Sequence, residues 1–279
     1  MTQVLFVLLA VVAVAAVLLL WGRASWHRYI SNLFTEVDTA ASTTIEYVGF
    51  EELNELPTPV QKYFRLVLKE GAPIINRTSV VQKGGFRPKP ELKEWSTMEA
   101  TQQFSSRPRA LVWNANIAMI PGVSIDVCDL YKDGKGSMRG KILSLFTLID
   151  AKEQKELNEG ALQRYLAEAV WFPTALLPSQ GVLWSVIDEQ RAKATVTDGA
   201  TTTSLEFTFN DNGEIVSAYT PERYREVSGT YESTPWGGRY ANYVDINGYL
   251  VPIECEVEWY LQEGVYTYFR ATLDEILYD

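Results

Sequence analysis

Histidine is nearly absent from this chain of 279 residues, where the single copy is His27. Zinc centres built on several imidazoles, Ser-His-Asp triads and histidine proton shuttles elsewhere in the chain are therefore excluded. Cysteine is also scarce. Cys128 and Cys255 are the two copies, which excludes a disulfide-rich scaffold. They could form one bridge in an oxidising compartment or remain as small buried thiols within strands.

Positive charge is in deficit as well, with 25 basic against 35 acidic residues and a net charge of −10 at pH 7. This is the wrong sign for neutralising phosphates, so nucleic acid is not expected as a partner. Gly-rich phosphate loops and the G-x-S-x-G nucleophile elbow do not occur, so no cofactor is expected. Asp126, Asp129 and Asp133 cluster near one hairpin but lack the spacing of a calcium loop, so no metal site is expected either.

Charge is missing altogether from the 18 apolar residues between Val4 and Trp21. As a helix this run would span roughly 27 Å, which matches a bilayer core. Trp21 and Trp26 then stand where an interfacial aromatic belt would lie. The alternative is a cleaved signal peptide, with Gly22 and Ala24 as the small residues before the cleavage site. Because the apolar run is long and no basic residue precedes it, a retained single span is favoured.

The side of the membrane that the body faces follows less directly. Arg23 and Arg28 come after the span and nothing basic comes before it, so the positive-inside rule favours the cytoplasm. A large domain can be exported against two charges, and the side stays open. Within the chain we expect an anchor and juxtamembrane segment over 1–30, a stalk over 31–50 and one β-rich domain over 51–279.

The body reads as mainly β, with two helices. The spacing of apolar residues predicts a helix over 58–69 and a second helix over 156–171. Asp-Gly and Asn-Gly pairs at 133, 198, 212 and 247 separate alternating segments, which is typical of antiparallel hairpins. The predicted strands cover 77–86, 95–104, 109–119, 122–132, 137–149, 182–188, 191–198, 202–210, 214–220, 238–246, 249–261 and 265–276. Such a set favours a curved antiparallel meander, an open or half-closed barrel whose concave face is partly covered by the helices.

Alternation also predicts which side chains share a face. Cys255, Val257 and Trp259 fall on the apolar face of their strand, with Ile253 and Leu261. Glu254, Glu256 and Glu258 fall on the other face and are expected to be solvated, where like charges discourage edge pairing.

Three segments resemble an uncharacterised family of bacterial membrane-anchored proteins: LPTPVQKYFR from 56 to 65, YKDGKGSMRG from 131 to 140, and GALQRYLAEAVWFPTALLP from 160 to 178. The resemblance continues through SLEFTFNDNGEIVSAY, RYREV and STPWGGRYANY, so it covers nearly all of the body. It implies a domain of unknown function and carries no reaction with it. In architecture alone, the meander with two helices is similar to the half-barrels of lipoprotein-localisation factors, which bind acyl chains in a concave apolar cavity.

Candidate ligand-binding residues come from these segments. They are polar or aromatic side chains that could line the mouth of an apolar cavity: Tyr131, Arg139, Arg164, Glu168, Trp171, Trp236, Arg239 and Tyr240. Arg164 and Glu168 lie four residues apart on one helical face, which also fits an ordinary ion pair. Arg164 or Arg239 could contact an anionic head group.

Three functions remain open on this basis. The first is a membrane-tethered, non-catalytic binding module for an apolar or acyl-bearing ligand, such as a lipid or lipoprotein. The second is a histidine-free enzyme that uses carboxylates or tyrosines, whose sign would be two acids converging in a cleft with perturbed pKa values. The third is a scaffold in a membrane assembly, which would expose a flat apolar patch.

Overall fold

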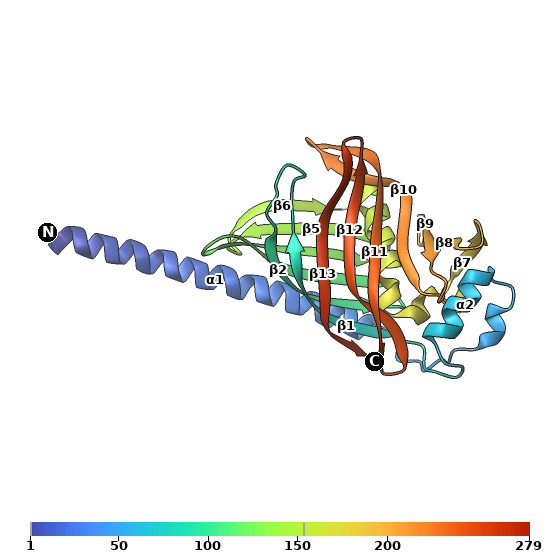
Figure 1. Ribbon diagram of the computed structural model, residues 1–279. Helices are drawn as coiled ribbons and strands as arrows, with labels where there is room; N and C mark the ends of the chain where they lie inside the picture. Colours follow the sequence, from blue (N-terminus) through green and yellow to red (C-terminus); the bar gives the residue numbers. More distant parts are fainter. Residues whose placement is uncertain (1, 153) are drawn as a thin grey trace.

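The computed structural model describes residues 2–152 and 154–279, which form one antiparallel sheet, a long N-terminal helix and shorter helices (Figure 1). The helices are α1 (Thr2–Ala40), η1 (Phe50–Leu53), α2 (Thr58–Val67), α3 (Lys155–Glu168), η2 (Ala169–Trp171), η3 (Pro173–Leu176) and η4 (Pro178–Gln180). The strands are β1 (Arg77–Phe86), β2 (Ser96–Ser105), β3 (Ala110–Ile120), β4 (Val123–Lys132), β5 (Lys135–Ile142), β6 (Phe146–Lys152), β7 (Val182–Val186), β8 (Arg191–Asp198), β9 (Thr201–Phe209), β10 (Ile215–Val227), β11 (Thr230–Ile246), β12 (Tyr249–Leu261) and β13 (Gly264–Tyr278).

The expected meander is confirmed, with spatial order β6-β5-β4-β3-β2-β1-β13-β12-β11-β10-β9-β8-β7. Every neighbour in space is a neighbour in sequence, except that β1 pairs with β13. The two edge strands, β6 and β7, are joined in sequence by α3 and the three short helices that follow it. The chain therefore leaves the sheet at one edge and re-enters it at the other.

Two hairpins differ from the prediction. The segment expected as one strand over 137–149 is two strands, because Leu143 and Ser144 form the turn between β5 and β6 with φ values of 53° and 58°. Residues other than glycine, asparagine and aspartate rarely adopt such positive φ values, which explains why no turn was predicted there. Strand β10 was expected to end at 220 but continues to Val227. Pro221 lies where the pairing with β11 shifts register, between Thr220 and Arg223, and such an irregularity accommodates a proline within a strand.

The concave face carries the main core. Helix α2, predicted over 58–69, buries Tyr63, Phe64 and Val67 as its spacing indicated. Helix α3 ends at Glu168, three residues earlier than predicted, and continues as η2. Both helices pack in the same cluster as the apolar rows of the sheet, so the helices and the concave face share one core.

Helix α1 does more than the expected anchor. Residues 31–40 were expected to begin a stalk, but the helix runs unbroken to Ala40 and buries Trp26, Ile30, Leu33 and Val37. These side chains lie four, three and four residues apart, which places them on one stripe of the helix. They pack on the outer face of the sheet against Ala110, Val112 and Cys128. The body thus sits directly on the helix that precedes it.

The two cysteines lie on opposite faces of the sheet and both are free. Cys128 contacts α1 on the outer face, whereas Cys255 belongs to the concave core. Glu254 is exposed as expected, but Glu258 is only 2% exposed on the outer face, where it accepts a hydrogen bond from the Tyr260 hydroxyl at 2.8 Å. Cys255, Val257 and Trp259 all line the concave side, so the alternation predicted for this strand is confirmed.

Candidate functional site

A cavity of about 540 Å³ remains between the concave face of the sheet and α3. Its walls come from the β3–β6 side, from α3, and from the facing strands β10–β13. Most of the lining is apolar or aromatic, including Trp113, Ile125, Val127, Leu148, Ile149, Val257, Trp259 and Phe269. The concave face is therefore not filled by its own side chains.

A group of charged side chains interrupts this apolar lining. Arg164 on α3 donates to the carboxylate of Asp129 on β4 at 2.6 Å and to that of Glu168 at 2.8 Å. The side chains of Arg164, Asp129 and Glu168 are 16%, 20% and 15% exposed, so they face the cavity rather than bulk solvent. Gln102 donates a further hydrogen bond to Glu168 at 2.7 Å. The ion pair expected from the i, i+4 spacing is thus present, with a third member from the sheet.

Burial governs the protonation of this group. It raises the pKa of both Asp129 and Glu168, and the neighbouring Arg164 only partly offsets this effect. For Arg164 itself, burial opposes the charged form, but Glu168 and Asp129 outweigh it and raise the pKa. The two acids therefore take up protons more readily than ordinary carboxylates.

Arg223 on β10 adds a positive charge to the same cavity. It donates to the carbonyl of Gly160 at 2.6 Å and to Oε1 of Gln163 at 3.3 Å, and its guanidinium lies 4.3 Å from the centre of the Trp236 ring. Among the described residues no carboxylate forms an ion pair with it. Burial lowers its pKa, yet a guanidinium stays protonated in proteins. Arg225, two residues along the strand, also lines the cavity.

Three buried polar atoms in the lining have no hydrogen-bond partner: Nε1 of Trp171, Oδ1 of Asp129 and Nε of Arg225. Buried polar groups are nearly always paired, so each unpaired one calls for a specific explanation.

The structure gathers five of the eight expected ligand-binding residues around this cavity: Arg164, Glu168, Trp171, Trp236 and Tyr240. Tyr240 reaches across to α3, where its hydroxyl donates to the carbonyl of Ala167 at 2.9 Å. Trp236 donates from Nε1 to the hydroxyl of Tyr268 at 3.1 Å. These contacts tie β11 to the helix and to β13.

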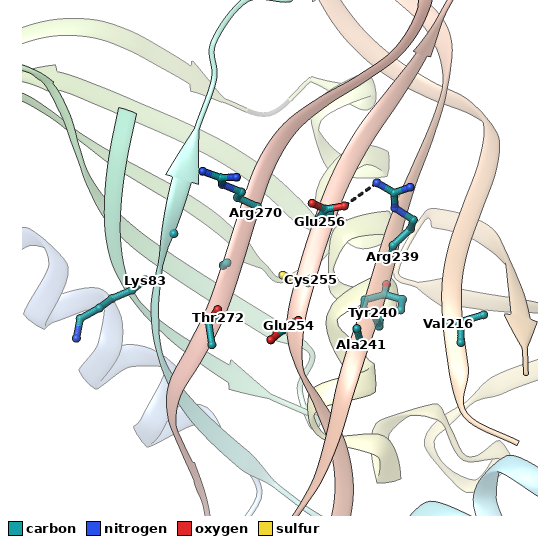
Figure 2. A pocket seen from close by; sticks show the side chains of 12 residues that line it. Lys83, Val216, Arg239, Tyr240, Ala241, Glu254, Cys255, Glu256, Arg270 and Thr272 are labelled. Atoms are coloured by element: carbon teal, nitrogen blue, oxygen red, sulfur yellow. Dashed lines mark hydrogen bonds and ion pairs between the residues drawn. The ribbon is translucent and has the colours of Figure 1, made fainter. Parts of the chain in front are cut away.

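The other three expected residues lie elsewhere. Tyr131 is fully buried in the core and donates to Asp198 at 2.6 Å. Arg139 faces α1, with its guanidinium 5.0 Å from the centre of the Tyr29 ring. Arg239 lies on the face opposite the cavity, where it pairs with Glu256 at 2.6 Å in a shallow hollow that crosses β10–β13 and reaches β1 (Figure 2).

Sequence reasoning missed Arg223 as a cavity residue. A signal was present, because the RYREV segment places Arg223 and Arg225 two residues apart and so on the same face of a strand. The sequence does not indicate which face of the sheet these two side chains occupy, because that depends on the register of β10. Within residues 2–152 and 154–279, no group of three or more histidine, cysteine or acidic side chains could hold a metal ion.

Comparison with known proteins gives a family and two similar folds. Residues 54–278 match a family described as a family of unknown function, DUF6920. No curated protein matches the chain. A candidate outer membrane lipoprotein-sorting protein domain from Vibrio parahaemolyticus is 10% identical, with a TM-score of 0.42, over 73% of this chain and 86% of that one. A LolA superfamily protein from Nitrosomonas europaea is 13% identical, with a TM-score of 0.34, over 78% and 91%.

Proposed function

Since the chain belongs to this family of unknown function, DUF6920, we propose its function from its own geometry: it is a membrane-tethered module that binds an acyl-bearing ligand. The cavity on the concave face is the observation that carries the proposal. Its volume of about 540 Å³ lies within the range of roughly 300–1,000 Å³ that is typical of small-molecule sites. Its apolar walls favour a hydrocarbon chain over a polar metabolite.

The charged side chains give the ligand an anionic end. Arg223 and Arg225 bring two guanidinium groups to the cavity, whose lining also includes Glu156 and Glu226. Among the described residues no carboxylate forms an ion pair with either arginine. Arginine binds phosphate and carboxylate oxygens with charge-assisted hydrogen bonds, which are stronger than neutral ones. A phospholipid or a fatty acid combines the two features that this lining matches.

The N-terminal helix supplies the tether. Among the described residues α1 is the helix long and apolar enough to cross a bilayer. Its most apolar stretch of 18 residues has a mean hydropathy of 3.2, and none of these residues is buried against the body. Its first 20 residues stand clear of the body (Figure 1). Because α1 continues onto the sheet, a span through the bilayer would hold the cavity next to the membrane that supplies its ligand.

Native mass spectrometry of the full chain in detergent tests whether a lipid stays bound. A phospholipid or fatty acid mass that leaves only on unfolding supports the proposal. Absence of any such mass, together with no binding of a fluorescent fatty acid, would refute it.

A pair of variants shows whether the ligand occupies the cavity. Gly238 lines the cavity wall, and a Cβ there would meet its nearest neighbours at an ordinary 3.5 Å. Gly238→Phe places a ring in the cavity and should abolish fatty acid binding. Ala241→Phe adds the same ring on an exposed part of the same strand and should leave binding unchanged. Equal effects of the two changes would place the ligand elsewhere.

A histidine-free enzyme is a second candidate, because Asp129 and Glu168 do converge in a cleft with raised pKa values. Paired acids with shifted pKa values are a common feature of acid–base catalysis. Arg164 bridges the two carboxylates, which favours a structural role for them. Incubation of the full chain with a co-purified lipid, followed by mass analysis, separates the two functions. If the intact lipid disappears with the natural chain but persists with Glu168→Gln, the enzyme is favoured.

A further inference from the structure

Two hairpin turns of the sheet lack charge over unusual lengths. Residues 117–125 surround the turn between β3 and β4, and residues 142–149 surround the turn between β5 and β6. Neither segment contains an acidic or basic residue, although 22% of the whole chain is charged. Apolar side chains at these turns are exposed to solvent: Ile120 at 64%, Phe146 at 66% and Leu148 at 52%. Exposed apolar side chains gathered in this way mark an interaction surface.

The two turns lie against each other. The backbone amide of Leu143 donates to the carbonyl of Ser124 at 3.0 Å, and the hydroxyl of Ser144 donates to Asp126 at 2.6 Å. We call residues 117–125 and 142–149 together the apolar rim. Its parts therefore form one surface rather than two separate tips.

The apolar rim lies where α1 leaves the body. A Cβ added to Gly22 would lie 2.6 Å from Cδ2 of Leu145, so the helix and the second turn are in close contact. Gly22 directly follows the uncharged run that ends at Trp21. In Figure 1 the green hairpins of β3–β6 point along α1 toward the N-terminus. If the uncharged run crosses a bilayer, the apolar rim must stand at the level of its surface.

The cavity wall and the apolar rim are continuous. Ile117, Met119 and Ile125 of the first segment line the cavity, as do Leu148 and Ile149 of the second. An apolar path therefore leads from the cavity to the end of the sheet that faces the candidate span.

Resting on the proposed function, we infer that the apolar rim enters the interfacial layer of the phospholipid bilayer beside α1 and opens the cavity to the acyl chains there. A bilayer is the occupant that these observations favour, because the rim adjoins a membrane-crossing helix and has no charge for a head group to repel. Aromatic and aliphatic side chains at an interface bury their apolar surface among the head groups and acyl chains. The ligand could then enter the cavity without crossing water.

Site-specific labelling of the full chain tests this placement. Cys128 and Cys255 are buried and burial raises the pKa of both thiols to about 12, so an introduced surface cysteine reacts first with a thiol-directed fluorophore. Ile120→Cys and Phe146→Cys place the label on the apolar rim. Leu183→Cys and Val265→Cys, at positions 71% and 58% exposed in β7 and β13, are matched controls. Each labelled chain is reconstituted into phosphatidylcholine–phosphatidylglycerol vesicles that carry a nitroxide on an acyl chain.

We expect the labels at 120 and 146 to show blue-shifted emission and several-fold stronger quenching by the acyl-chain nitroxide than the labels at 183 and 265. Equal quenching at all four positions would overturn the inference, because the body would then lie on the bilayer in another orientation. Blue-shifted emission without quenching would also overturn it, since the rim would be covered by protein. Fatty acid binding, measured in the same samples, tests the cavity separately: unquenched rim labels with binding retained refute the rim alone.

Discussion

Arg223 is the residue whose replacement should separate head-group binding from chain binding. Arg223→Gln removes a half-buried guanidinium that donates to Gly160 and Gln163 and packs on Trp236. A hydrogen bond to a charged group contributes about 1.5–3 kcal/mol. Loss of one such bond to a ligand phosphate or carboxylate corresponds to roughly 10- to 100-fold weaker binding.

The assay compares two ligands with the same acyl chains. We expect Arg223→Gln to weaken binding of a phosphatidylglycerol by that factor and to change the affinity for the neutral diacylglycerol little, because the apolar walls are intact. Arg239→Gln is the matched control. Arg239 pairs with Glu256 on the opposite, outer face, and its replacement should affect neither ligand.

Equal weakening of both ligands by Arg223→Gln would contradict this expectation, since the residue would then act only on the shape of the cavity. A variant that no longer folds would give the same result, so the midpoint of thermal unfolding is recorded alongside. The lost hydrogen bonds and ring contact should cost about 2 kcal/mol of stability. Retention of full phosphatidylglycerol affinity would equally refute a role in head-group binding.

Four further predictions concern the acidic pair of the cavity, helix α1 and the two cysteines. Because burial raises the pKa of Asp129 and Glu168, these two carboxylates should be neutralised before ordinary ones as the pH falls. The affinity for phosphatidylglycerol should therefore rise as the pH falls through their pKa values. In a binding titration, Glu168→Gln should reduce that rise. The two groups also cost folding stability above their folded pKa values, and thermal unfolding should show this cost disappearing toward acid pH. Trp26→Ala removes a buried ring and the hydrogen bond that its Nε1 donates to Asn114 at 2.9 Å, so the free energy of unfolding in detergent should fall by about 3–5 kcal/mol. The two cysteines should react with iodoacetamide only after denaturation, without prior reduction, and a requirement for reductant would contradict the free thiols.

The hairpins show how far local sequence determines this fold. Asp133-Gly134 and Asn247-Gly248 adopt positive φ values at both turn residues, as their sequence predicts. Leu143 and Ser144 adopt the same kind of turn against their intrinsic preference. The strands that flank them, and the contact of Leu145 with α1, hold that conformation. A turn determined by tertiary contacts leaves no signal in its own residues.

The sequence predicted that a concave apolar cavity with polar side chains would exist, but it did not predict correctly which side chains line it. The segments that resemble the uncharacterised family contain Arg164, Glu168 and Trp236, and the fold does bring these side chains to one cavity. Arg239 comes from an equally suggestive segment, yet it lies on the other face of the sheet. Consecutive residues of a strand alternate between faces, so the curvature and register of the whole sheet decide which of them meet.

The unbroken course of α1 limits where the proposed module could deliver a ligand. A flexible stalk would let the body move away from a bilayer that α1 crosses, but residues 22–40 lie on the sheet as part of one helix. A body held in this way has a fixed orientation relative to α1 and can move little away from it. It would act as a stationary receiver, so transfer of a ligand to another membrane would require a second, mobile component to visit the cavity.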